Sequence, residues 1–437
     1  MDRFGPSVVR RLISTSGRRV VSPDNQVKKL DHPFPKARAQ FALHPHAQQP
    51  SAVGKLPCMQ TTKPWDTLSG QYQLRPGTSP GIVGQRPVLG AGRLGRLLQG
   101  QGGEQVGRTL SSVFTLCAHA HRRCAELALA AAQSPQAAPE RPAAALLYLE
   151  TARDHLRSIA LDWPQRLTEL GPEAQRMDWV RGCPLPLASV RPVTDEDVAW
   201  QTLKALRGWL ETSVLKQDAL SWLQDCREPD TLAQWCQTQG ASLWPARCLS
   251  AWHPLAYSLR PTLRALDVLS ANAARQQEGL RQLGHALAQD ADFAQHPNWL
   301  GHAAETGAWT RLRHRQQQTA HSAWTRMSAR WLELVELAAV DPQGVAQGGP
   351  PVLASGALQL ADGQALAWCE MARGLLLHWA QIDAKGAVKD YRVLAPTEWN
   401  FHPQGALACA VADLPSDATA TARTLAAAYD PCVLCTV

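Results

Sequence analysis

The chain has 437 residues, of which 45% are hydrophobic, and this is enough to bury the core of a globular protein. Its net charge of +7 belongs to residues 1–60, which hold ten Lys and Arg and three acids, so the remainder is neutral overall. This basic, proline-rich segment predicts a disordered leader over 1–70 and a folded domain over 71–437. The leader does not interleave basic and aromatic residues, so we expect no nucleic-acid partner. Its positive charge leaves binding to nucleic acid or to an anionic surface as a secondary alternative.

Hydropathy and cysteine usage exclude two further classes of protein. No run of about 18 apolar residues occurs, so we expect no transmembrane span. Two arginine pairs, Arg10-Arg11 and Arg18-Arg19, are each followed by a stretch too short and too polar for a signal peptide. Eleven cysteines are an odd number without small-domain spacing, which excludes a disulfide scaffold. The sequence therefore predicts a reduced, cytoplasmic protein.

The predicted helices follow a small strand region in the glycine-rich residues 70–110. A first helix is expected to begin after Ser111 or Ser112, and to include the Ala/Leu-rich residues 125–132. Pro164 should end the second predicted helix, which begins at residue 143. The later predicted helices span 143–160, 195–215, 264–287, 319–340 and 418–428. The core candidates of the helix over 319–340 are Trp324, Trp331, Leu332, Leu334 and Leu337.

Strand patterns return late in the chain. Apolar or alternating runs predict strands over 365–368, 374–382 and 389–394, with Lys385-Gly386 as a hairpin turn. The expected fold class is therefore α+β and predominantly helical, a long-helix bundle with small β portions.

The segment Asp430-Pro431-Cys432-Val433-Leu434-Cys435 carries a CxxC motif. Two thiols at this spacing can bind one metal ion or form a redox pair, and proline fixes the backbone before the first of them. Far upstream, Cys117, His121 and Cys124 stand at i, i+4 and i+7, on one face of the predicted helix. This stripe is either a buried core face or part of a metal site. Cys117, His121, Cys432 and Cys435 could together form a zinc site.

These two motifs, in this order, resemble those of the large subunit of nickel–iron hydrogenases, RxCGxCxxxH and DPCxxCxxH. Three further segments are similar to conserved stretches of that family, so the resemblance covers residues 85–437. They are Gly301–Gly307 (GHAAETG), Arg373–Trp379 (RGLLLHW) and Ala395–Asn400 (APTEWN).

The chain departs from the family pattern at several positions. Phe114 stands where the first motif has its leading cysteine, and Ser112 where it has its arginine. Gly95 stands where the family has a proton-relay glutamate. The given sequence ends at Val437 without the last histidine of the second motif, and we expect no cleavable tail. The resemblance therefore implies an incomplete nickel site, no bound nickel and no enzymatic activity.

The resemblance implies that this chain keeps the iron-binding half of the family's nickel–iron site. Cys117, Cys432 and Cys435 would bind iron as thiolates, while Arg373 and Thr397 would hold its cyanide ligands; His121 also belongs to this cofactor-binding set. The pattern is similar to hydrogenase maturation proteins of the HupK/HoxV type. It implies a scaffold that binds Fe(CN)2CO transiently and passes it to the hydrogenase large-subunit precursor. The implied partners are a small HypC-type chaperone and its iron-assembly partner.

Three alternatives remain open at this point. The chain could be a working hydrogenase large subunit with altered ligands, a zinc or redox CxxC protein, or a relative that binds accessory proteins but no metal. Cys124, one helical turn beyond His121, is a minor candidate ligand.

Overall fold

The computed structural model describes residues 70–90, 92–134, 144–166, 177–187, 193–240, 242–269, 272–313 and 321–437. The predicted leader over 1–70 lies outside the described residues, apart from Gly70. All described residues belong to one compact unit that spans 61–437. They form mostly helices, with one three-stranded and one four-stranded sheet. The expected class, α+β and predominantly helical, is confirmed.

The four-stranded sheet consists of β3 (Ser355–Ala361), β4 (Gln364–Met371), β5 (Gly374–Ile382) and β6 (Val388–Leu394). The strands pair antiparallel in chain order, as successive hairpins. The predicted strands correspond to β4, β5 and β6. The edge strand β3 was not predicted, because only part of its surface is buried and its apolar pattern is weak.

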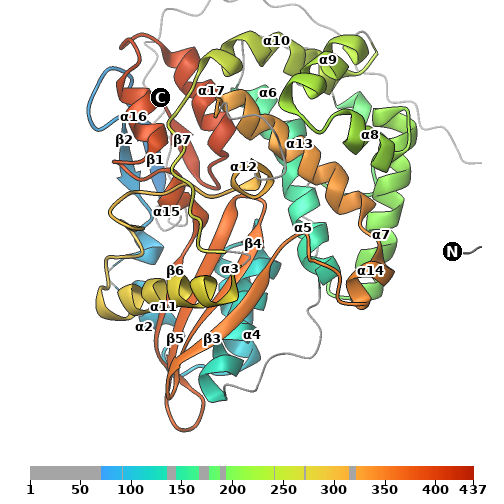
Figure 1. The fold of residues 1–437 in the computed structure, drawn as a ribbon. Coiled ribbons are helices and arrows are strands. Elements are labelled where there is room, and N and C mark those ends of the chain that lie inside the picture. The colour runs from blue at the N-terminus through green and yellow to red at the C-terminus, as the bar shows by residue number, and fades with distance from the viewer. Residues whose placement is uncertain are drawn as a thin grey trace, which may run out of the picture. The chain divides into compact units, whose positions relative to one another are not determined.

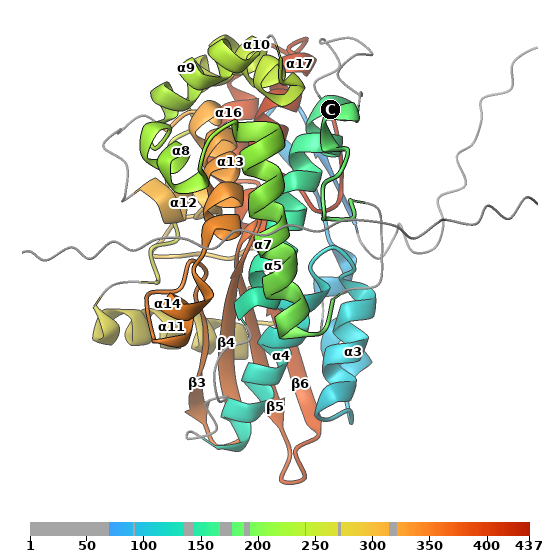
Figure 2. The same ribbon diagram turned by 90° about the vertical axis from the view of Figure 1, so that its right-hand side faces the viewer.

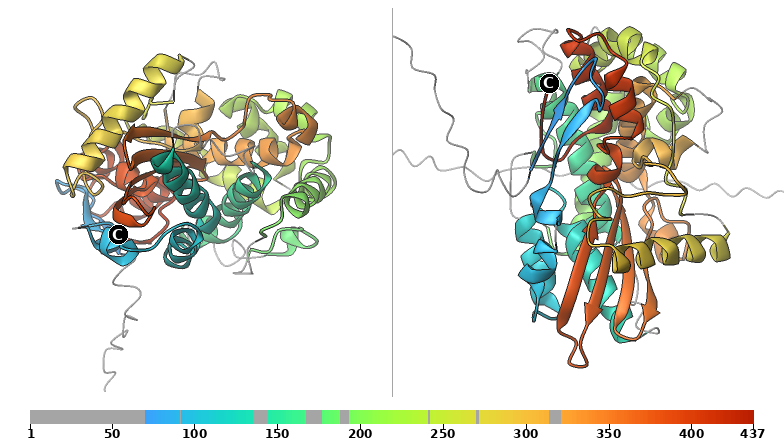
Figure 3. Two further views of the ribbon diagram at one scale, coloured as in Figure 1. Left: turned by 90° about the horizontal axis from the view of Figure 1, so that it is seen from below. Right: turned by 90° about the vertical axis from the view of Figure 1, so that its left-hand side faces the viewer.

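Helices cover both faces of this sheet. Helix α4 (Ala118–Gln133) packs on one face and α11 (Ala273–Gln289) on the other, and the view from below shows them on opposite sides (Figures 1 and 3). Because successive side chains of a strand point to opposite faces, neighbouring residues enter two different clusters. Cys369 and Leu376 pack toward α4, whereas Trp368 and Leu377 pack toward α11.

The three-stranded sheet joins the two ends of the described chain. Strands β1 (Gln71–Leu74) and β2 (Ile82–Gln85) are antiparallel, and β7 (Leu434–Thr436) pairs parallel to β1 (Figure 3). Cys435 lies opposite Tyr72 in this register. The strand β7 was not predicted from its three residues, and it determines where the second half of the CxxC motif lies.

Three long helices, α5 (Ala144–Arg157), α7 (Glu196–Trp209) and α13 (Ala323–Ala339), pack against one another (Figure 2). The α13 core candidates Trp324 and Trp331 are fully buried, as predicted. Helix α7 continues as a wide turn to Leu215, so the predicted span of 195–215 is confirmed.

The prediction that Pro164 ends the second helix is wrong. Helix α5 continues through a wide turn, Ser158–Asp162, into α6 (Trp163–Arg166). In this turn the Trp163 N–H donates to the Ser158 carbonyl five residues earlier. The wider spacing lets the helix pass through proline, which has no N–H to donate and would clash in a regular turn.

The start of the predicted helix over 264–287 is also wrong. Helix α11 begins only at Ala273, where the Asn272 side chain accepts a hydrogen bond from the Arg275 N–H at 3.0 Å. Ala265 instead forms an isolated bridge with Glu305, in which the Leu266 N–H donates to the Glu305 carbonyl at 2.8 Å. Tertiary pairing thus overrides the local helical pattern.

Ten further helices lie in the described part of the chain, and no helix there is long and apolar enough to cross a membrane. They are α2 (Arg93–Leu98), α3 (Glu104–Val113), α8 (Ala219–Asp225), α9 (Pro229–Gln239), α10 (Trp244–Ser258), α12 (Ala308–Leu312), α14 (Pro342–Ala346), α15 (Pro396–Asn400), α16 (Ala406–Ala412) and α17 (Thr419–Tyr429). The last of these confirms the predicted helix over 418–428.

Candidate functional site

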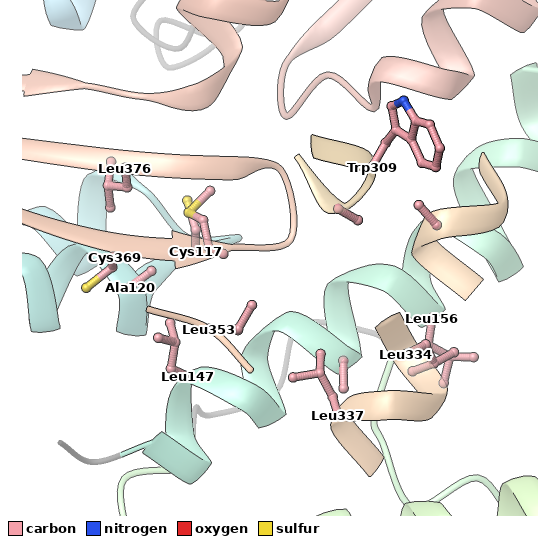
Figure 4. Packing of buried hydrophobic residues seen from close by; sticks show 14 of the residues in the cluster. Cys117, Ala120, Leu147, Leu156, Trp309, Leu334, Leu337, Leu353, Cys369 and Leu376 are labelled. Atoms are coloured by element: carbon pink, nitrogen blue, oxygen red, sulfur yellow. The ribbon is translucent and has the colours of Figure 1, made fainter. Parts of the chain in front are cut away.

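The first motif lies at a break between two helices. The predicted start after Ser111 or Ser112 is wrong, because both serines end α3 and donate their hydroxyls back to carbonyls four residues earlier. The chain turns at Phe114, and α4 begins directly after Cys117. Cys117 is therefore buried at the N-terminus of α4, among the side chains packed between the helices and the sheet (Figure 4).

A carboxylate from α5 caps this helix start. Glu150 accepts hydrogen bonds from the backbone N–H groups of His119, at 2.7 Å, and Ala120, at 2.9 Å. These N–H groups have no partner within their own helix, so an anion at this position stabilises α4. Burial and the neighbouring Asp154 raise the pKa of Glu150 to about 7, against the opposing effect of these hydrogen bonds.

Arg373 occupies the two-residue turn between β4 and β5, in which Met371 pairs with Gly374. Its guanidinium is buried and meets two carboxylates. Nη1 donates to Asp154 at 3.0 Å, and Nε lies 3.3 Å from Asp430. A charge in the protein interior is tolerated only when it is paired, and Arg373 is paired twice.

Asp430 connects this arginine to the second motif. It also accepts hydrogen bonds from Ser158, at 2.7 Å, and Arg330, at 3.1 Å. Burial alone would raise the pKa of Asp430, but Arg330 and Arg373 lower it to about 2, so the carboxylate is ionised at neutral pH. These contacts hold the end of α17, where Asp430 is left-handed at φ 49°, and so direct the chain toward Cys432.

Asn400 braces the backbone behind Arg373. Its side-chain amide donates to the carbonyls of Thr306, at 2.9 Å, and Arg373, at 3.3 Å, while its oxygen accepts from the Thr306 N–H at 2.9 Å. Three of the segments that carry the resemblance, around residues 306, 373 and 400, therefore meet at one point. This fixes the turn that carries the guanidinium.

Four of the predicted site residues come together. The Thr397 hydroxyl lies 3.1 Å from the Cys432 sulfur. Burial raises the pKa of the Cys117 thiol, Cys432 raises it further, and Arg373 opposes this rise. Cys117, Cys432 and Arg373 therefore lie within electrostatic range of one another, although their segments are far apart in the chain.

Cys435 and His121 are placed differently from these four. Cys435 is half-buried on β7, where burial raises its pKa to about 11. His121 Nδ1 lies 3.0 Å from His378 Nε2, and its ring stacks on Phe114 with centroids 3.8 Å apart. Within the described residues, no group of three or more His, Cys, Asp or Glu side chains is arranged to hold a metal ion.

Sequence reasoning missed several charged residues at the site. Arg86 is buried with its Nη1 3.6 Å from Glu398, and its guanidinium lies 5.6 Å from the ring centre of Phe114. Glu150 and Asp154 could have been noticed, because acids four residues apart interrupt the apolar face of a predicted helix. Arg86 lies in a loop without periodicity and gave no such signal.

Gly95 packs closely against β6. A Cβ atom there would lie 2.5 Å from the Asp390 carboxylate and 3.2 Å from the Tyr391 carbonyl oxygen. Any side chain at this position would require Asp390 to move. The backbone packing of this chain is therefore adapted to glycine at position 95.

Part of the chain matches a known protein family. Residues 310–437 match the family model described as nickel-dependent hydrogenase, a span that includes Arg373, Thr397, Cys432 and Cys435 but not Cys117. A solved structure, the NAD+-reducing nickel–iron hydrogenase in the H2-reduced state, aligns with a TM-score of 0.47 at 14% identity. This alignment covers 80% of the present chain and 92% of that chain.

More extensive similarity is found to curated relatives. The chain is 38% identical over 400 residues to the hydrogenase expression/formation protein HoxV of Cupriavidus necator, covering 85% of this chain and 95% of that protein. It is 28% identical over 358 residues to the hydrogenase expression/formation protein HupK of Bradyrhizobium diazoefficiens, covering 78% of this chain and 88% of that protein. The chain belongs to the HoxV/HupK family, and the predicted resemblance is confirmed.

Proposed function

We propose that this protein is a non-catalytic scaffold in the formation of nickel–iron hydrogenase, and that it carries the Fe(CN)2CO group. The relatives that support the role in hydrogenase formation are named as expression/formation proteins. The observation that supports the iron group is the convergence of Cys117 and Cys432 on the buried guanidinium of Arg373. Phe114 takes the position of a nickel ligand in the same motif.

The residues present suit an iron group with anionic ligands. Thiolates are soft ligands, and Cys117 and Cys432 are two sulfurs of the proposed site that lie within electrostatic range of each other. Burial raises the pKa of the Cys117 thiol, so we expect this thiol to release a proton when the iron group binds. Arg373 has five N–H donors, more than its two carboxylate contacts use, and can donate to a cyanide nitrogen.

Cys435 is the third proposed ligand, and Thr397 and His121 complete the proposed site. Cys435 lies three residues after Cys432 on the short strand β7. Thr397 contacts the Cys432 sulfur, while His121 braces Phe114 at the start of α4. Two or three thiolates hold the group less firmly than a four-thiolate site with nickel, which favours its release.

The proposed partners follow from this role. The iron group would come from a HypC-type chaperone with its iron-assembly partner, and would pass to the hydrogenase large-subunit precursor. All ten cysteines of the described residues are free thiols, which supports a reducing, cytoplasmic location.

Infrared spectroscopy tests the proposal, with iron quantified on the same anaerobically purified protein. The protein should be produced with the complete set of accessory proteins. We expect cyanide and carbon monoxide bands that disappear in Cys117→Ala and Cys432→Ala and weaken in Cys435→Ala. The matched control is Cys409→Ala, which removes an exposed thiol on α16 and should leave the bands unchanged.

Other results would support the alternatives. Iron-free protein with one zinc per chain, lost in the same cysteine variants, would favour a zinc site. Hydrogen uptake by the protein paired with a small subunit would favour a working hydrogenase. Protein without metal, together with normal hydrogenase maturation in Cys117→Ala cells, would contradict any role of this thiol.

A further inference from the structure

A second buried arginine, Arg86, pairs with Glu398, which directly follows Thr397, the residue whose hydroxyl lies 3.1 Å from the Cys432 sulfur. It follows β2 in the chain and is only 6% exposed. Burial would lower its pKa, but Cys432 is the strongest of the neighbours that raise it, and Cys117 contributes as well. The positive charge of Arg86 therefore lies within electrostatic range of both proposed iron ligands.

The charge of Arg86 is poorly compensated by the protein itself. Its nearest acid is Glu398, at 3.6 Å, which is too long for a hydrogen bond. Its Nε makes no hydrogen bond within the described residues. Burial raises the pKa of Glu398, which weakens this carboxylate as a counter-ion. A buried guanidinium with donors left over is expected to find its partner in a ligand.

The ring of Phe114 lies close to this cation. The guanidinium lies 5.6 Å from the centre of the Phe114 ring, and the other side chain at that ring is His121, stacked at 3.8 Å with an interplanar angle of 7°. Attraction between a cation and an aromatic ring is strongest where water is excluded, as here. Arg86 thus lies against the residue that replaces a cysteine of the first motif.

We propose that Arg86 determines the specificity of the Cys117–Cys432 site: its fixed positive charge excludes a second metal cation and favours a metal complex with anionic ligands. A divalent ion at these sulfurs would be repelled by a buried charge that cannot leave. A dicyano iron group, in contrast, brings acceptors for the unused N–H donors. The inference rests on the proposed function for the identity of the iron group, but the exclusion of nickel can be measured without it.

Equilibrium dialysis against Ni2+ alone tests the exclusion, using the full chain purified without the iron group and kept reduced. We expect weak binding by the wild-type protein, and binding of one nickel at least about tenfold tighter by Arg86→Met. Arg86→Lys keeps the charge and should behave like the wild type. Adding Cys432→Ala to Arg86→Met should abolish the gain. The matched control is Arg392→Met, since Arg392 also lies over a ring, that of Trp379 at 5.2 Å, but on β6.

A second variant tests whether nickel affinity depends on the charge of Arg86 or on the number of thiols at the site. Phe114→Cys adds a sulfur while Arg86 remains, and we expect its nickel affinity to stay near that of the wild type. Tight nickel binding by Phe114→Cys alone would overturn the proposal, as would tight binding by the wild type through Cys117 and Cys432. No gain in Arg86→Met, or a gain that survives Cys432→Ala, would overturn it as well.

Circular dichroism establishes that each variant is folded. If Arg86→Met does not fold, Arg86→Gln and Phe114→Cys test whether Arg86 excludes nickel. Arg86→Gln removes the charge but keeps a polar side chain, and Phe114→Cys leaves Arg86 unchanged. The infrared test separates the two proposals. If the cyanide bands are absent but nickel is still excluded, only the proposed function is contradicted. If the cyanide bands are present but nickel binding does not depend on Arg86, only this inference is contradicted.

Discussion

Two buried arginines lie within electrostatic range of the same pair of sulfurs, and the protein holds them in different ways. Arg373 contacts Asp154 and Asp430, at 3.0 and 3.3 Å, and its backbone is braced by Asn400. Arg86 has one acid, at 3.6 Å, and the Nε atoms of both arginines make no hydrogen bond among the described residues. Two carboxylates compensate the charge of Arg373 before any ligand binds, whereas a single, more distant carboxylate faces the charge of Arg86.

The difference separates a structural role from a recognition role. A doubly paired guanidinium holds its turn, and with it Asp430 and the entry to Cys432, in one geometry. A weakly paired guanidinium has N–H donors that are free to bind a ligand. The two sides of the site should therefore respond differently to mutation: loss of Arg373 should chiefly cost stability, and loss of Arg86 should chiefly change ligand preference.

The largest expected effect comes from Arg373→Met. This change leaves two buried carboxylates without one of their cations and should lower the free energy of unfolding by about 3–5 kcal/mol. Arg86→Met should cost only about 1–2 kcal/mol, because Glu398, whose pKa is already raised by burial, can take up a proton. Urea denaturation of both variants measures the difference. Equal costs would show that the two arginines do not differ in role.

A smaller effect, and one that depends on pH, is expected for Asp430→Asn. Burial opposes ionisation of Asp430, but Arg330 and Arg373 lower its pKa from 3.8 to about 2. A depressed carboxyl pKa stabilises the folded state above the unfolded value near 4, and this contribution of about 2 kcal/mol is lost as the pH falls toward 2.

The free energy of unfolding at pH 6 and pH 3 checks this expectation. The difference in stability between wild type and Asp430→Asn should shrink at the lower pH. The exposed Asp413→Asn is a control that should follow the wild type at both values. A difference that is constant with pH would contradict the assignment of Asp430 as an ionised partner of the arginines.

The smallest effect is expected for Thr397→Val, which keeps the shape of the side chain and removes the hydroxyl 3.1 Å from the Cys432 sulfur. Stability should fall by about 1 kcal/mol, the typical net value of one hydrogen bond. In the iron-loaded protein, the cyanide bands should shift while the iron content is retained. Unchanged band positions would show that Thr397 does not contact the bound group.

Much of the fold followed from local patterns. The apolar faces of α7 and α13 and the runs of β4, β5 and β6 were predicted because each is long enough for its period to be evident. The start of α4, the passage through Pro164 and the strand β7 were not. The start of α4 depends on Glu150 from another helix, the passage through Pro164 depends on a wide turn, and β7 depends on pairing with β1.

The sequence alone determined which residues are available for chemistry: the segments that carry the resemblance, with Cys117, Cys432, Arg373 and Thr397, and a phenylalanine at position 114. Only the tertiary structure decided how they are used, because burial and long-range pairing set the charge balance. It brought Arg86 and Asp154 to the two sides of the site, and it paired His121 with His378. Electrostatic energies depend on distance and burial, and neither can be deduced from the order of residues in the chain.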